Sequence, residues 1–168
     1  MARVLGLVAG SCGGLDTRFV TELAEPAVAL GWRPAITLTP TAARWLESTG
    51  QLGKLRALSD LAVRSESRLP GEPRPHPDPD VFVFAPASAN SVAKLALGIA
   101  DNQALTVLGD VLGDPRVTIV LGYQVQDSRL RHPAWQGHLD TLASAGVQPH
   151  RLIYGRPWTE VLDLLPTS

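Results

Sequence analysis

Residues 4–14 read VLGLVAGSCGG, an unbroken apolar run that ends in a glycine-rich turn. A run that is apolar on both faces is typical of a central strand in a parallel sheet, because helices cover both sides of such a strand. Residues 4–9 are therefore predicted to be a buried strand. A helix follows it, with Phe19, Leu23, Ala27 and Leu30 at helical spacing, Asp16 available as a cap at its start and Gly31 at its end.

The rest of the chain repeats this alternation of strand and helix. The pattern predicts strands at residues 35–38, 81–85, 117–121 and 152–154, and helices at 41–46, 92–99, 102–112, 135–146 and 158–165, with a weaker helical pattern at 51–61. Alternating strands and helices imply a parallel sheet covered on both faces. The predicted fold is a three-layer, doubly wound α/β sheet, flavodoxin-like or Rossmann-like, in one domain spanning residues 1–168.

Residues 69–80 interrupt the pattern and read LPGEPRPHPDPD. Five prolines in this stretch exclude a helix or a central strand, so the segment is predicted to be an extended surface loop within the domain.

Composition excludes several classes of partner. A net charge of -1, with arginines scattered along the chain, argues against nucleic acid. The first apolar run is too short to span a bilayer and has no signal-type cleavage site after it, so no membrane association is expected. Cys12 is the only cysteine, which excludes an internal disulfide, offers no metal site and indicates a reducing, cytoplasmic location.

Ligands of such sheets bind at the carboxyl ends of the strands, where this chain places several small polar residues. Gly10 and Ser11 follow the first strand, and Thr39 and Thr41 follow the second. Together they would suit a terminal phosphate monoester. The alternatives are a glycine-rich turn without a ligand and threonines that only cap a helix.

Two common classes of α/β protein fit this edge poorly. NAD-binding domains need the G-x-G-x-x-G spacing and an acidic residue after the second strand, where this chain has Thr39-Pro40-Thr41. Phosphoryl-acceptor receiver domains need acidic residues at the end of the first strand, and none precedes Asp16.

Residues 86–102 read PASANSVAKLALGIADN and contain the densest group of candidate ligand contacts. Ser88, Asn90 and Ser91 are short polar groups at a strand-to-helix turn, suited to the edge of a planar heterocycle. Asp101 and Asn102 either contact the ligand or cap the next helix, and helix capping is also the alternative role of the serines.

This segment resembles the PASANT-x-x-K-x-A-x-G-I-x-D-N-L motif of the homo-oligomeric flavin-containing cysteine decarboxylases. The resemblance implies FMN held between the subunits of a trimer, or a multiple of one, and a peptide or small-molecule substrate whose cysteine is oxidised by the flavin and then loses carbon dioxide. It places the FMN against a set of small residues, with the phosphate toward the first three: Gly10, Ser11, Thr39, Thr41, Pro86, Ser88, Ala89, Asn90 and Asp101.

Two features of that family are missing. Its catalytic histidine, in the segment before the third strand, falls on Glu72, and the nearest histidine is His76. Its P-x-M-N motif after the fourth strand is replaced by LGYQVQD at residues 121–127. Arg131 and His132 follow, and His132 is the preferred candidate catalytic residue, with His76 as the second; both could instead be exposed loop histidines.

The proline loop, the His132-Pro133-Ala134 segment and the Pro157-Trp158 tail are closer to an actinobacterial-type branch of these flavoproteins. The main functional alternative is a non-catalytic flavin-binding module that acts through a protein partner. A prenyl-flavin-type transferase of similar fold is disfavoured by the PASAN spelling of residues 86–90.

Overall fold

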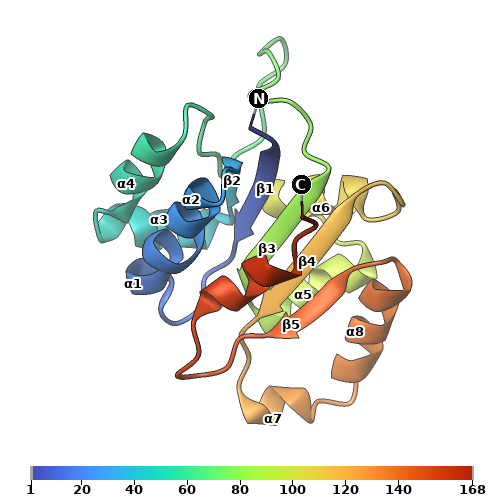
Figure 1. The fold of residues 1–168 in the computed structure, drawn as a ribbon. Coiled ribbons are helices and arrows are strands. Elements are labelled where there is room, and N and C mark those ends of the chain that lie inside the picture. Colours follow the sequence, from blue (N-terminus) through green and yellow to red (C-terminus); the bar gives the residue numbers. More distant parts are fainter. Residues whose placement is uncertain (1, 168) are drawn as a thin grey trace.

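The computed structural model describes residues 2–167 and contains one five-stranded parallel sheet (Figure 1). The strand order is β2-β1-β3-β4-β5, the flavodoxin-like arrangement, which confirms the predicted fold class. The strands are β1 (Val4–Ala9), β2 (Arg33–Leu38), β3 (Val81–Ala87), β4 (Thr118–Tyr123) and β5 (Gln148–Arg151).

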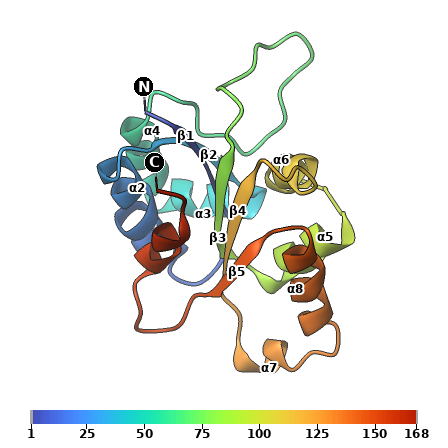
Figure 2. The same ribbon diagram turned by 45° about the vertical axis from the view of Figure 1, so that its right-hand side comes forward.

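Helices cover both faces of the sheet. They are α1 (Leu15–Phe19), the π-helical η1 (Val20–Ala24), α2 (Glu25–Ala29), α3 (Pro40–Ser48), α4 (Gln51–Leu58), α5 (Ala89–Leu97), α6 (Gln103–Val111), α7 (Asp127–Leu130), α8 (Trp135–Ser144) and the 3-10 helix η2 (Trp158–Leu164). One core lies between the sheet and the helices α1, η1, α2, α3, α4 and η2, and the other between the sheet and α5, α6 and α8 (Figure 2). None of the helices within residues 2–167 is long and apolar enough to cross a bilayer.

Four of the five strands, β1 to β4, lie within two residues of their predicted positions because most of their side chains are buried. In β1, Leu5 and Leu7 enter one core and Val8 enters the other. All seven residues of β3 are buried. Burial on both sides produces the continuous apolar runs by which β1, β3 and β4 are recognised.

The prediction of the last strand at residues 152–154 is wrong. The last strand is β5, which ends at Arg151. In the predicted segment, the Leu152 N–H donates to the Tyr123 carbonyl of β4 at 2.8 Å, but the residues after it lie outside the sheet. Tyr154 is fully exposed. β5 is an edge strand, which tolerates Pro149 and polar side chains, so its sequence lacks the apolar run of a central strand.

The prediction of the first helix needs two corrections. The helix begins at Leu15, so Asp16 lies in its first turn, and the N-cap is Gly14 with φ 88°. The helix is also divided by the π-helical turn η1. Its end is as predicted, because Gly31 adopts φ 88° after Leu30.

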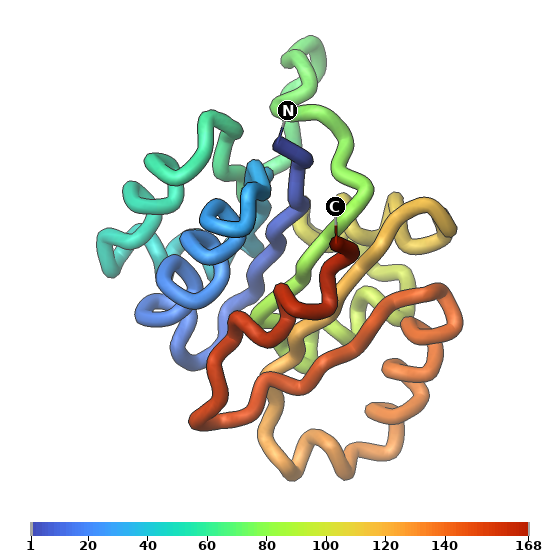
Figure 3. The backbone as a smooth tube through the Cα atoms, viewed as in Figure 1, coloured from blue at the N-terminus to red at the C-terminus, as the bar shows by residue number. Residues whose placement is uncertain are grey.

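The proline-rich loop extends from the amino end of the sheet, beside the start of β1 (Figures 1 and 2). Before the loop, Arg64 forms a parallel bridge with Thr37 of β2. After it, Asp80 pairs with Arg3 at 3.2 Å. The first and last described segments approach each other (Figure 3), where Ala2 and Thr167 line one cavity of about 440 Å³.

Candidate functional site

The main cavity lies at the carboxyl edge of the sheet, where β1, β3, β4 and β5 end. Its volume is about 900 Å³, at the upper end of the range of small-molecule and cofactor sites. It is lined by residues from four segments: Ser11, Cys12, Gly13, Gly14 and Arg18; Ser88; Gln124, Val125, Gln126 and Asp127; and Arg151, Leu152, Ile153, Tyr154 and Trp158.

The turn after β1 forms the floor of this cavity. The N–H of Gly10 donates to the Pro86 carbonyl at 2.8 Å, which joins the turn to the end of β3. A Cβ at Gly10 would lie 3.2 Å from that carbonyl oxygen, so a glycine permits the close approach. The N–H groups of Ser11, Cys12 and Gly13 make no hydrogen bond within residues 2–167 and are free to bind an anion.

Cys12 also lies in this turn. Its side chain is buried, and burial raises the pKa of the Cys12 thiol to about 12. The thiol is therefore protonated at neutral pH, whereas a nucleophilic cysteine must be a thiolate.

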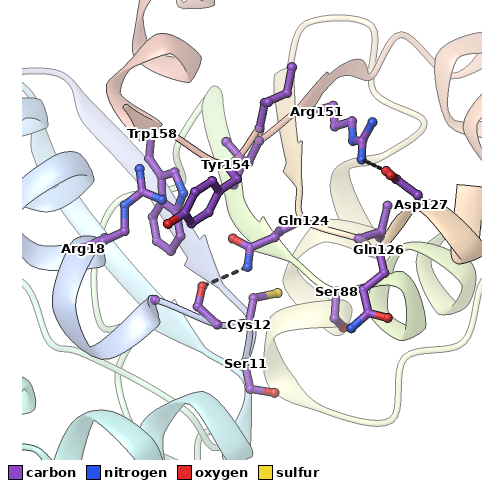
Figure 4. A pocket seen from close by; sticks show the side chains of 15 residues that line it. Ser11, Cys12, Arg18, Ser88, Gln124, Gln126, Asp127, Arg151, Tyr154 and Trp158 are labelled. Carbon is purple, nitrogen blue, oxygen red and sulfur yellow. Dashed lines mark hydrogen bonds and ion pairs between the residues drawn. The ribbon is translucent and has the colours of Figure 1, made fainter. Parts of the chain in front are cut away.

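Gln124 connects the turn after β1 to the segment after β4. Its Nε2 donates to the Gly13 carbonyl at 2.9 Å, and its backbone N–H donates to the Ala87 carbonyl at 3.0 Å (Figure 4). The segment that replaces the P-x-M-N motif of the resembled family is thus tied to both β1 and β3.

Arg18 and Trp158 form one wall. The Arg18 guanidinium binds both carboxylate oxygens of Glu22, at 2.9 and 2.8 Å, and lies 4.7 Å from the centre of the Trp158 ring. It also donates to the Arg156 carbonyl at 2.7 Å. Hydrogen bonds from Arg18, and one from the Trp158 N–H, hold the pKa of Glu22 below its usual range.

Arg151 and Asp127 lie on the other side of the cavity (Figure 4). The Arg151 Nη2 donates to an Asp127 carboxylate oxygen at 2.6 Å. This pair links the end of β5 to the first residue of α7.

Of the residues predicted to bind the cofactor, the structure places Ser11 and Ser88 in this cavity. Gly10 and Pro86 lie beside it through their hydrogen bond. The Ser88 hydroxyl also caps α5 by accepting from the Ser91 N–H at 3.2 Å, and Ala89 is the first residue of that helix.

The other predicted cofactor contacts lie outside the cavity within a single chain. Thr39 caps α3 by accepting from the Ala42 N–H at 3.3 Å, and Thr41 accepts from Arg44 at 3.2 Å. Asn90 is exposed at the start of α5.

Asp101 pairs with Lys94, and it lines a separate cavity of about 270 Å³ that includes Pro40 and Asn102. Asn102 caps α6 by accepting from the Leu105 N–H at 2.9 Å. Thr39, Ser88 and Asn102 therefore cap helices, the alternative role that the sequence offered for them. This role does not exclude a contact with a ligand.

Neither predicted catalytic histidine lines the main cavity. His132 is exposed between α7 and α8, where its Nδ1 accepts from the Ala134 N–H at 3.1 Å. His76 lies in the proline-rich loop and lines a cavity of about 410 Å³ with Arg64 and Arg68. One chain therefore does not bring the two histidines together.

The sequence does not predict several side chains of the cavity, including Arg18, Arg151 and Tyr154. Glu22, four residues after Arg18, is a local partner, but Arg156 and Trp158 come from the other end of the chain. Arg151 and Tyr154 escape prediction because the last strand ends at Arg151 and does not begin at Leu152. Within residues 2–167, no three His, Cys, Asp or Glu side chains are grouped to hold a metal ion.

Solved structures with this fold share little sequence with the chain. The FMN-dependent cysteine decarboxylase TvaF from thioviridamide biosynthesis is 22% identical, with a TM-score of 0.75 over 98% of this chain and 96% of its own. HAL3 from Cryptococcus neoformans is 17% identical, with a TM-score of 0.75 over 96% and 93%. The peptidyl-cysteine decarboxylase EpiD is 18% identical, with a TM-score of 0.65 over 89% and 86%.

At these low sequence identities, the structural similarity establishes the fold alone. No curated protein matches the chain by sequence. The sequence model of the flavoprotein family matches residues 18–164, which cover most of the chain and all of the sheet except β1. The chain therefore belongs to the flavoprotein family.

Proposed function

We propose that the cavity at the carboxyl edge binds FMN and that the holoprotein oxidatively decarboxylates a C-terminal cysteine of a peptide, or carries out a related flavin-dependent oxidation. The observation that carries the FMN proposal is the turn after β1, where Ser11, Cys12 and Gly13 line the cavity and their N–H groups have no partner within residues 2–167, so that they and the Ser11 hydroxyl could bind a phosphate. Ser88 lines the same cavity, and the volume of this cavity suits a flavin nucleotide.

The roles of the protein follow from this geometry. When bound, FMN would accept the two hydrogens that the cysteine loses, and carbon dioxide would leave. The turn at residues 11–13 would hold the phosphate, while Ser88 would donate to the cofactor or accept from it. Gln124 would fix the segment after β4 against the turn, and Trp158 would keep water from one side of the cavity.

The first test is whether the purified protein retains FMN. We expect a yellow protein with about one FMN per chain, measured by visible absorbance and by mass spectrometry of the released compound. A protein that stays colourless after incubation with excess FMN would refute the proposal.

Asn90→Ala separates cofactor binding from folding. Asn90 is exposed and makes no side-chain hydrogen bond within residues 2–167, so its removal should leave the melting temperature unchanged. Asn90 lies outside the cavity of its own chain, so it would contact FMN held by a neighbouring subunit of the proposed oligomer, and loss of that hydrogen bond should weaken FMN binding by about 0.5–1.5 kcal/mol. Ser88→Ala should weaken binding and also destabilise α5, because it removes the helix cap. Ser144→Ala, on the remote helix α8, is the matched control.

The reaction is tested with peptides that end in cysteine. Mass spectrometry of peptides incubated with the FMN-loaded protein should show loss of carbon dioxide and two hydrogens. His132→Ala and His76→Ala are run in parallel, since these are the predicted catalytic residues; full activity in both would reject that assignment. FMN binding without product from any peptide would favour the alternative, a flavin-binding module that acts through a protein partner.

A further inference from the structure

Three charged side chains line the main cavity: Arg18, Asp127 and Arg151. Arg18 is held in place, because its Nε and Nη2 bind both oxygens of Glu22, its Nη2 also donates to the Arg156 carbonyl, and its guanidinium stacks on Trp158. A ligand could use only its Nη1 without breaking these contacts. Arg151 is held by fewer contacts and is the cationic group better placed to bind a ligand.

Arg151 has donors to spare. Its Nη2 is bonded to Asp127, whereas its Nε is buried and has no hydrogen-bond partner within residues 2–167. A buried N–H without an acceptor is costly, and a guanidinium offers five N–H groups in a planar fork. Arg151 therefore lines the cavity with part of its fork unused and can bind a further acceptor.

The partner that Arg151 does have is easily replaced. The Asp127 side chain is 78% exposed and belongs to a helix of one turn, α7. Ion pairs with an exposed partner contribute little net stability, because water competes for both groups. A second carboxylate that entered the cavity could take the place of Asp127.

The sheet holds Arg151 in position. Arg151 is the last residue of β5 and is paired with Tyr123 of β4, and the next N–H, that of Leu152, donates to the Tyr123 carbonyl at 2.8 Å. The guanidinium is therefore presented from a strand end. Sites built on strands position their groups more accurately than sites on loops do.

We propose that Arg151 binds a carboxylate of the substrate in the main cavity, and that this carboxylate replaces Asp127 as the partner of Arg151. This inference rests on the proposed function, in which the same cavity holds FMN. A planar carboxylate matches the guanidinium fork, whereas the cofactor phosphate has its own cradle at residues 11–13, away from Arg151 and beyond Gln124 (Figure 4). The substrate class is a molecule with a free carboxylate near its reacting end, such as a peptide with an unmodified C-terminus.

The test compares two peptides that differ only at the C-terminus. Each has the same five residues and ends in serine, which the flavin cannot oxidise, and one is a free acid while the other is an amide. Calorimetric titration of the FMN-loaded protein should show tighter binding of the acid by about 10–100-fold, as expected for hydrogen bonds to a charged group. Arg151→Gln should abolish the preference, and Arg151→Lys should restore part of it.

Two further variants distinguish recognition from a structural role. Asp127→Asn removes the competing carboxylate and should tighten binding of the acid, whereas a purely structural ion pair would give no gain. Arg156→Gln is the matched control, since Arg156 is a neighbouring arginine whose side chain pairs with Glu160 and does not line the cavity; it should keep the preference.

Equal affinity for acid and amide would overturn the proposal, and so would a preference that survives in Arg151→Gln. If Arg151→Gln weakens FMN binding but not riboflavin binding, Arg151 serves the cofactor phosphate and the proposal is wrong. If the protein binds no FMN, the proposed function fails, but the acid and amide titration of the flavin-free protein still tests Arg151. Should Arg151→Gln not fold, the result for Asp127→Asn alone decides.

Discussion

Gly6 shows how one residue without a side chain supports the packing of the sheet. It lies in the middle of β1, and a Cβ built there would be 2.2 Å from the ring of Phe82 on the neighbouring strand β3. Phe82 is itself buried, so its ring has little room to move away. Gly6 is therefore required by its neighbour and not by its backbone conformation.

We expect Gly6→Ala to destabilise the protein by about 1–3 kcal/mol, because overpacking forces a buried ring or the sheet to shift. Urea unfolding would measure the change. The control is Gly109→Ala, within α6, where a Cβ meets no atom within 4 Å. That change should be neutral or stabilising by up to about 1 kcal/mol. Equal effects of the two substitutions would contradict this account of Gly6.

Cys12 gives a second prediction at the scale of one residue. Since burial raises the pKa of its thiol to about 12, the folded protein should resist alkylation by iodoacetamide at pH 8. The unfolded chain should be alkylated orders of magnitude faster, and mass spectrometry can follow both reactions. Rapid alkylation of the folded protein would mean that the turn after β1 opens readily.

At the scale of elements, the carboxylate of Glu22 joins helices from opposite ends of the chain. Glu22 lies in η1, binds Arg18 of α1 and accepts from the backbone N–H of Trp158, the first residue of η2, at 2.8 Å. These contacts hold the last helical segment against the first one and complete a wall of the cavity.

The lowered pKa of Glu22 predicts how stability depends on pH. A carboxyl group whose pKa is lower in the folded than in the unfolded state stabilises the fold above the unfolded pKa, and this contribution is lost as the pH falls through the folded pKa. Melting temperatures measured between about pH 5 and pH 3 should therefore fall less steeply in Glu22→Gln than in the wild type. Glu47→Gln, on the exposed side of α3, is the control and should leave the slope unchanged.

At the scale of the whole molecule, we propose that the protein assembles as a trimer or a multiple of one. The family resemblance motivates this proposal, and a single chain leaves Thr39, Asn90 and Asp101 outside the cavity that contains Ser11 and Ser88. A neighbouring subunit would be needed if all of these residues are to contact one FMN. Leu97, the last residue of α5, and Ile99, just after it, are also exposed apolar side chains that an interface could bury.

Light scattering after size exclusion should give a mass of three times the 17.9 kDa chain, or a multiple of that. The trimer should persist when FMN is removed if the apolar contacts dominate. A monomer that retains FMN would contradict the proposed assembly.

The sequence by itself determined the fold class and the positions of four strands, but not that of β5. β1, β3 and β4 are buried on both faces, so a local apolar run is sufficient to recognise each of them. The local sequence also offered helix capping as one of two roles for Thr39, Ser88 and Asn102, because a cap involves residues only three positions apart, and the structure shows the caps. It also showed that Ser11 and Ser88 belong at the carboxyl edge, since parallel strands end there together.

Only the tertiary structure decided which side chains share the cavity. Arg18 meets Trp158 across most of the length of the chain, and Arg151 enters the cavity because β5 is an exposed edge strand that has no apolar run to mark it. The proline-rich loop was recognised from its composition, but its position at the amino end of the sheet, with His76 outside the main cavity, depends on how the chain packs before and after it. Local patterns record burial and backbone geometry, whereas contacts between distant segments arise only when the whole chain folds.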